Sequence, residues 1–242
     1  MNSPQHALDR PIWTALTTQQ RHLGLGDTLA RRFHPDVAPF AAIAADTPDA
    51  WRALHALLQP NEQVAILSSD APASIDIDSL QAKRVGTIHQ MIATQPFTHS
   101  TDDSDVMHLG SADVDDMLAL VQRTRPGPFG RRTHEMGRYI GIREHGELIA
   151  MAGERMCIDG YVEISAVCVD ERCRGRGLSG RLMNILRREI GLRGATPFLH
   201  VFSHNESAIG VYERLGFELR HAFALTQVMH ADPATPASRH SA

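Results

Sequence analysis

A short run of glycines and arginines, placed between an apolar strand pattern and an amphipathic helix pattern, constrains this chain most. Residues 174–180 read RGRGLSG. Glycine adopts backbone angles that other residues avoid, so the run predicts a sharp turn that brings N–H groups close to a ligand. The helix that follows adds unpaired N–H groups and the positive end of its dipole. Together these features predict an anion site suited to a phosphate or pyrophosphate.

The pattern around this turn predicts alternating strands and helices. Apolar residues recur every second position over 161–169 and every third or fourth position from Leu178 to Ile190. A further strand, a helix ending at Gly216 and a last strand follow, over residues 197–203, 207–215 and 217–225. Upstream, the pattern predicts a strand at 105–109, a helix after Ser111, and a hairpin formed by 139–143 and 148–156.

Composition narrows the class of protein further. The 242 residues are 43% hydrophobic, with a net charge of −4, which gives no sign of general nucleic-acid or membrane binding. The three cysteines and fourteen histidines lack the spacing of metal ligands, so we expect no metal. The N-terminus lacks a secretory pattern and no apolar run reaches membrane-spanning length, so we expect a cytoplasmic protein.

One alternative for the glycine run is a dinucleotide site, because Gly175, Gly177 and Gly180 satisfy G-x-G-x-x-G. Three features disfavour it. Residues 170–174 separate the strand from the first glycine, no acidic residue closes the next strand, and a hairpin precedes the run where a βαβ unit belongs. We therefore discount a nucleotide-dependent oxidoreductase.

Two motifs in this half are similar to those of a known family. The segment V-x-V-x4-R-G-R-G-L-S over residues 167–179 resembles the pyrophosphate-binding motif of the GNAT N-acetyltransferases. The segment NESAIGVYERLGF over residues 205–217 resembles the later N-x-x-A-x-x-x-Y-x-x-x-G-F motif of that family. Ser179 departs from the usual glycine or alanine but is still small. The resemblance covers about residues 105–229.

The resemblance implies an α/β fold with a mixed twisted sheet and flanking helices, the GNAT or acyl-CoA N-acyltransferase fold. In it the parallel strands 161–169 and 197–203 separate, and the cofactor arm bonds the first at Val167 and Val169. The implied cofactor is acetyl-CoA. Its implied contacts are Val167, Cys168, Val169, Arg174, Gly175, Arg176, Gly177, Leu178, Ser179, Gly180, Asn205, Ala208 and Tyr212.

The same resemblance implies catalytic roles. Tyr212 occupies the position of the acid that protonates the leaving thiolate, and Glu163 that of a general base. Strict alternation along the strand places Glu163 on the same face as Val167 and Val169, and Cys168 on the other. His200 is a rival base, because imidazole titrates near neutrality.

The resemblance implies that the acceptor-binding loop includes Phe129 and Tyr139, so we expect substrate contacts from these two residues and from His200. We expect Cys168 to be a small buried residue. Asn205 is expected to bond the cofactor arm, to cap the last helix, or both.

We expect three segments: a smaller N-terminal α/β region over 1–95, a GNAT domain over 105–230, and a disordered tail over 231–242. Thr47-Pro48 predicts a helix start, and residues 63–68 and 87–92 predict strands. Polar residues 94–104 are expected to link the two regions. The first region carries no catalytic motif, so it is either a decayed copy of the second or a cap on the acceptor side.

The predicted reaction is direct attack of a bound primary amine, small or peptidic, on the acetyl thioester. The alternative is a protein that binds acyl-CoA without catalysis, as a sensor or regulatory subunit. The sequence leaves the identity of the amine open.

Overall fold

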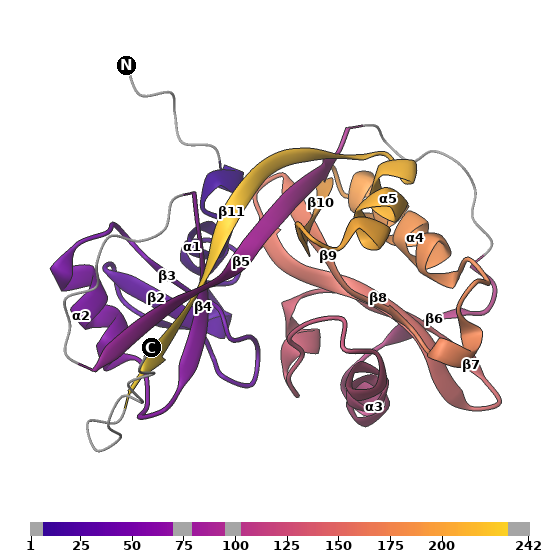
Figure 1. The fold of residues 1–242 in the computed structure, drawn as a ribbon. Coiled ribbons are helices and arrows are strands. Elements are labelled where there is room, and N and C mark those ends of the chain that lie inside the picture. Colours follow the sequence, from indigo (N-terminus) through magenta and orange to yellow (C-terminus); the bar gives the residue numbers. More distant parts are fainter. Residues whose placement is uncertain (1–6, 70–78, 95–102, 232–242) are drawn as a thin grey trace, which may run out of the picture.

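The computed structural model describes residues 7–69, 79–94 and 103–231. Most of the expected linker and almost the whole expected tail lie outside these residues. Eight strands form one sheet in the order β4-β11-β5-β10-β9-β8-β7-β6, and a second sheet has the order β1-β2-β3 (Figure 1). The expected fold class, a mixed sheet flanked by helices, is confirmed.

The strands of the larger sheet are β4 (Gln63–Ser68), β5 (Leu80–Ala93), β6 (Val106–Leu109), β7 (Tyr139–Glu144), β8 (Glu147–Ile158), β9 (Tyr161–Val169), β10 (Thr196–Phe202) and β11 (Phe217–His230). The smaller sheet contains β1 (Gly24–Gly26), β2 (Ala30–Phe33) and β3 (Ala41–Ile43). The helices are α1 (Pro11–Thr17), α2 (Pro48–Ala56), α3 (Val114–Thr124), α4 (Leu178–Leu192) and α5 (Glu206–Arg214).

The C-terminal half has the elements that its periodicity predicts. The hairpin of β7 and β8, strand β9, helix α4 and strand β10 follow one another as expected. The apolar stripe of α4, including Leu182, Leu186 and Ile190, is buried against β8, β9 and β10. Helix α3 packs on the opposite face of β8 and β9, so helices cover both faces (Figure 1).

The N-terminal half is richer than its sequence pattern predicts. Helix α2 begins as predicted, with Thr47 accepting a hydrogen bond from the N–H of Ala50. Helix α1 and strands β1 to β3 were not predicted, because they are short and their apolar residues show too few repeats to reveal a period. Strand β5 is 14 residues long, and its first half is polar and mostly exposed, which hides it from a hydrophobicity pattern.

The two halves share one sheet. Strand β5, from the N-terminal half, lies between β11 and β10 of the C-terminal half, and β4 pairs with β11. Main-chain hydrogen bonds therefore cross the expected boundary at residue 95 along three ladders. The division into functional regions at that boundary stays a prediction.

One glycine provides a direct test of the packing at the β7–β8 pair. A Cβ atom added to Gly153 would lie 2.2 Å from two ring carbons of Tyr139. We expect Gly153→Ala to lower the free energy of unfolding by about 1–3 kcal/mol, because the ring has to move. Urea denaturation followed by circular dichroism measures this change.

The matched control is Gly191→Ala in α4, where an added Cβ meets nothing within 4 Å. Alanine favours helix over glycine by about 1 kcal/mol, so this variant is expected to be as stable as the parent or more so. Equal losses in the two variants would contradict the packing described for Gly153.

Candidate active site

Strands β9 and β10 are parallel neighbours that pair only at their beginnings. The paired residues are Thr196↔Tyr161, Pro197↔Val162 and Phe198↔Glu163. Beyond them β10 continues along β5, and β9 continues along β8. The edge of β9 that faces β10 therefore has main-chain groups without a strand partner from Ile164 onward, as predicted, and such groups need hydrogen-bond partners.

A bulge in β9 changes which side chains share a face. The register with β8 shifts between Met151 and Gly153, and Ala166 adopts a left-handed φ of 52°. After this extra residue, Val167 and Val169 pack on the α4 side, with Val162 and Ile164, whereas Cys168 packs with Tyr139 on the other side. The expectation that Glu163 shares a face with Val167 and Val169 is therefore wrong.

The glycine run forms an open turn at the start of α4. Gly175 and Gly177 have φ values of 79° and 74°, the left-handed region that favours glycine. The first helical hydrogen bond runs from the N–H of Arg181 to the carbonyl of Gly177, so three main-chain N–H groups precede it. A Cβ at Gly175 or Gly177 would meet nothing within 4 Å, which leaves room over the turn. These features fit a phosphate group.

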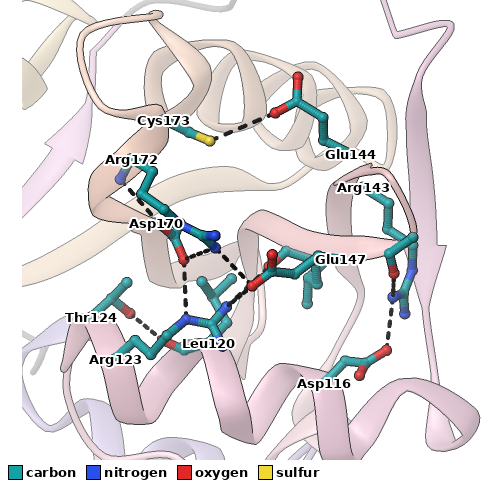
Figure 2. A network of polar contacts seen from close by, with 12 residues as sticks. Asp116, Leu120, Arg123, Thr124, Arg143, Glu144, Glu147, Asp170, Arg172 and Cys173 are labelled. Atoms are coloured by element: carbon teal, nitrogen blue, oxygen red, sulfur yellow. Dashed lines mark hydrogen bonds and ion pairs between the residues drawn. The ribbon is translucent and has the colours of Figure 1, made fainter.

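A network of charges anchors the strand side of this turn (Figure 2). Asp170 directly follows β9 and accepts hydrogen bonds from Arg172 Nε at 2.8 Å and from Arg123 Nε, on α3, at 3.0 Å. Both arginines also contact Glu147, at the start of β8. The side-chain and main-chain donors of Arg172, followed by Arg123, lower the pKa of Asp170. Arg172 is therefore engaged in holding the turn.

The two arginines within the turn have weaker partners. Arg174 lies 3.3 Å from Glu171, and Arg176 lies 3.2 Å from Glu144. All four side chains are exposed, and exposed ion pairs contribute little to stability. A phosphate can therefore compete with these carboxylates for Arg174 and Arg176.

Glu163 and His200, the two predicted candidates for a base, are in direct contact. Glu163 is 0% exposed and accepts hydrogen bonds from His200 Nδ1 at 2.7 Å and from Arg155 at 2.9 and 2.5 Å. Burial alone would raise the pKa of Glu163, but the charge of Arg155 and the hydrogen bonds from Arg155 and His200 outweigh it and hold that pKa below its ordinary value. Glu163 is thus a paired carboxylate.

The contacts continue into the N-terminal half. The Nε2 atom of His200 lies 3.2 Å from the side-chain amide nitrogen of Gln90, which also donates to the carbonyl of Leu8. Because an amide nitrogen only donates, Nε2 of His200 is the acceptor, and the proton of the neutral ring is on Nδ1. Gln90 accepts from Arg220, and Arg220 pairs with Asp9.

Sequence reasoning missed Arg155, Gln90 and Arg220. A usable signal existed for Arg155, because a charged residue inside an otherwise buried strand needs an opposite charge nearby. No local signal existed for Gln90 and Arg220, which approach His200 only through strand pairing.

Helix α5 holds three of the predicted residues. Asn205 caps it by accepting a hydrogen bond from the N–H of Ala208, one of the two roles expected for it. Tyr212 is partly buried, with its ring 6.3 Å from that of Phe217, and burial raises the pKa of its phenol. Ala208 and Tyr212 pack against the cluster around α4. Their contacts with a cofactor stay predictions.

The predicted substrate contacts differ in their burial. Tyr139 is 1% exposed, and its hydroxyl has no hydrogen-bond partner within the described part of the chain. Phe129 packs edge-on against Tyr139 and is partly exposed. The structure thus places Tyr139 in the core, where a substrate does not reach it without rearrangement. Cys168 is also buried, which raises the pKa of its thiol to about 11.

Comparisons with known proteins agree with this architecture. Residues 139–225 match a family model described as FR47-like protein. A structure described as a GNAT-family acetyltransferase from Novosphingobium aromaticivorans is 37% identical, covers 94% of this chain and 100% of its own, and has a TM-score of 0.86. Comparison with curated sequences gives no match.

Two more distant structures show the fold alone. A GCN5-related N-acetyltransferase from Kribbella flavida is 14% identical over 92% of this chain and 96% of its own, with a TM-score of 0.59. A GCN5-related N-acetyltransferase-like protein from Streptococcus suis is 16% identical over 90% and 92%, with a TM-score of 0.53. The match to the GNAT-family structure at 37% identity supports acyltransferase activity. The chain belongs to the GNAT acetyltransferase family.

Within 7–69, 79–94 and 103–231, no three side chains of His, Cys, Asp or Glu gather as metal ligands do. None of the helices in these segments combines the length and apolar character needed to cross a bilayer.

The pairing of Glu163 predicts a pH-dependent stability. A carboxylate with a lowered folded-state pKa stabilises the fold fully above its unfolded pKa, about 4.3, and loses this contribution as pH falls toward the folded value. We expect Glu163→Gln to cost about 3 kcal/mol at pH 7, because Arg155 loses its charged partner. The difference from the parent is expected to narrow below about pH 4.3.

Urea unfolding at a series of pH values measures both effects. Asp115→Asn, at an exposed ion pair with Arg131, is the control and is expected to match the parent throughout. A Glu163→Gln penalty that stayed constant down to pH 3 would contradict the assigned ionisation.

Proposed function

We propose that this protein transfers the acetyl group of acetyl-CoA to a primary amine by direct attack in a ternary complex. The observation that carries the proposal is the open glycine turn at the start of α4, next to the separation of β9 and β10. The glycine turn offers N–H donors for phosphates. The unpaired edge of β9 offers main-chain groups that can bond the amides of the pantetheine arm.

The turn would bind the pyrophosphate of the cofactor. The main-chain N–H groups of Leu178, Ser179 and Gly180 precede the first helical hydrogen bond, and the helix dipole adds positive potential there. Arg174 and Arg176 would exchange their exposed carboxylate partners for phosphate oxygens. Val167 and Val169 lie on the unpaired edge of β9, where the pantetheine amides would bond.

Tyr212 would protonate the leaving thiolate. Its partly buried phenol has a raised pKa, so it keeps its proton at neutral pH and can donate it as negative charge develops on sulfur. Cys168 is unsuited to a covalent intermediate, because burial keeps its thiol protonated. Direct attack by the amine is therefore the mechanism that these side chains support.

Glu163 and His200 are the candidates for the base side, and His200 could accept a proton at Nε2 only once the Gln90 amide that donates to it moves away. Glu163 accepts the Nδ1 proton of His200 and fixes the orientation of that ring. The lowered pKa of Glu163 makes this carboxylate a weak proton acceptor, so its contribution would be to orient His200 and to favour a cation nearby. A pH–rate profile of Glu163→Gln and His200→Ala separates the two, because only loss of the true base removes the acidic limb.

The first test combines binding with turnover. Calorimetry at low salt is expected to show coenzyme A binding, and acetyl-CoA with a panel of amines is expected to release free thiol. Gly177→Val is expected to weaken coenzyme A binding by at least tenfold, because a β-branched residue disfavours the left-handed φ. Gly110→Val, at an open position outside the turn with an extended backbone, is the control. Absence of coenzyme A binding would remove the proposal.

The second test addresses the acid. We expect Tyr212→Phe to lower kcat by about 100-fold with little change in the Kd for acetyl-CoA, because the ring is kept and only the proton donor is lost. Tyr161→Phe, at the paired end of β9, is the matched control and is expected to keep full activity. Unchanged turnover in Tyr212→Phe would exclude its role as acid.

A further inference from the structure

A cavity of about 490 Å³ lies in the N-terminal half, away from the glycine turn. Its lining residues belong to α1, α2, β3 and β4 and to the segments next to them. Figure 1 shows where these elements lie. This volume falls within the range of about 300–1,000 Å³ that is typical of small-molecule sites. The lining is mainly apolar, with the side chains of Ile12, Trp13, Ile43, Trp51, Ile66 and Leu67.

The cavity occupies a second separation of two parallel strands. The residues just before β3 contact β4 through one parallel bridge, Phe40↔Ala65, and a hydrogen bond of 2.7 Å from the N–H of Ala65 to the carbonyl of Pro39. Beyond this point β3 pairs only with β2, and β4 pairs only with β11. Helix α2 connects β3 to β4 as α4 connects β9 to β10, so the arrangement repeats that of the proposed cofactor site.

The entrance to α2 is nevertheless unsuited to a phosphate. Residues 44–49 read AADTPD, with two acidic residues where α4 has its glycine turn. Thr47 already caps the helix by accepting from the N–H of Ala50. The second cavity therefore calls for a ligand other than coenzyme A.

Arg10 determines which charge the cavity favours. Its guanidinium lies over the ring of Trp13 at 5.2 Å and donates to the carbonyl of Ile43. Within the described part of the chain no carboxylate lies within ion-pair distance of Arg10, and burial lowers its pKa. A partly buried cation held only by a carbonyl and a ring is stabilised by an anionic partner.

The other polar groups of the cavity are consistent with an anionic ligand. Asp9 is paired with Arg220 at 2.5 Å, and Asp46 accepts from the indole N–H of Trp51 at 2.6 Å, so both carboxylates are engaged. The hydroxyl of Ser68 is buried and lacks a hydrogen-bond partner in the described structure. Arg10 thus offers donors beside an apolar wall, whereas the buried Ser68 hydroxyl does not reach a ligand without a change of rotamer.

We propose that this cavity binds a small organic carboxylate with an apolar body, such as an N-acylated amino acid. The carboxylate would pair with Arg10, and the apolar body would lie against Trp13 and Trp51. This site is separate from the proposed acetyl-transfer site, and its existence does not depend on that function.

The chain supplies its own reporter for the test. Trp13 and Trp51 are its two tryptophans, and both line the cavity. Titration with N-acetyl-L-leucine is expected to change the tryptophan fluorescence to saturation. The neutral N-acetyl-L-leucinamide, which has nearly the same shape, is expected to bind at least tenfold more weakly. No saturable change with the acid, or equal binding of the amide, would overturn the proposal.

Substitutions of Arg10 test whether this residue binds the carboxylate. Arg10→Gln is expected to weaken binding of the acid at least tenfold and to abolish the preference for the acid over the amide. Arg10→Lys, which keeps the positive charge, is expected to keep part of that preference. Arg52→Gln, on the exposed face of α2, is the matched control and is expected to bind as the parent does. An Arg10→Gln variant that is folded and keeps the preference would also overturn the proposal. If that variant does not fold, the comparison of acid and amide on the unaltered chain still decides.

Discussion

The separation of β9 from β10 after three paired residues is the constraint on which the rest of the site depends. It leaves the main-chain groups of one strand edge without a strand partner, and it ends that strand at a turn that feeds α4. Because β10 is held by β5 and β9 by β8, the gap is built into the sheet. The glycine turn and the N-terminal end of the α4 dipole lie at the end of β9 that borders this gap. The bulge at Ala166 determines which side chains of β9 face α4.

Buried charge holds the two strands together at the base of this gap. Glu163 is the last paired residue of β9, and its carboxylate joins Arg155 on β8 to His200 on β10. Gln90 and Arg220 extend the contacts into β5 and β11. A network of this kind costs desolvation but fixes one arrangement of the strands, since each alternative leaves a charge unpaired.

The N-terminal and C-terminal halves contribute strands to one sheet, so the N-terminal region is part of the same structural unit as the glycine turn. Strand β5 lies between β11 and β10, and β11 lies between β4 and β5. The sheet order places a separation of parallel strands on each side of this central pair. One carries the glycine turn of a GNAT enzyme, and the other borders a cavity lined by both tryptophans and by Arg10.

The sequence alone determined the local features: the glycine turn, the start and face of α4, the cap at Asn205 and the extent of β9. These depend on contacts between neighbours along the chain, so periodicity and motif spacing reveal them. Tertiary structure decided the rest. The bulge in β9 places Val167 and Val169 on the face opposite to the predicted one. Tyr139 is buried in the core, and Glu163 is an ionised carboxylate paired with Arg155. Each of these depends on a residue distant in sequence, and no local pattern encodes which distant strand becomes the neighbour.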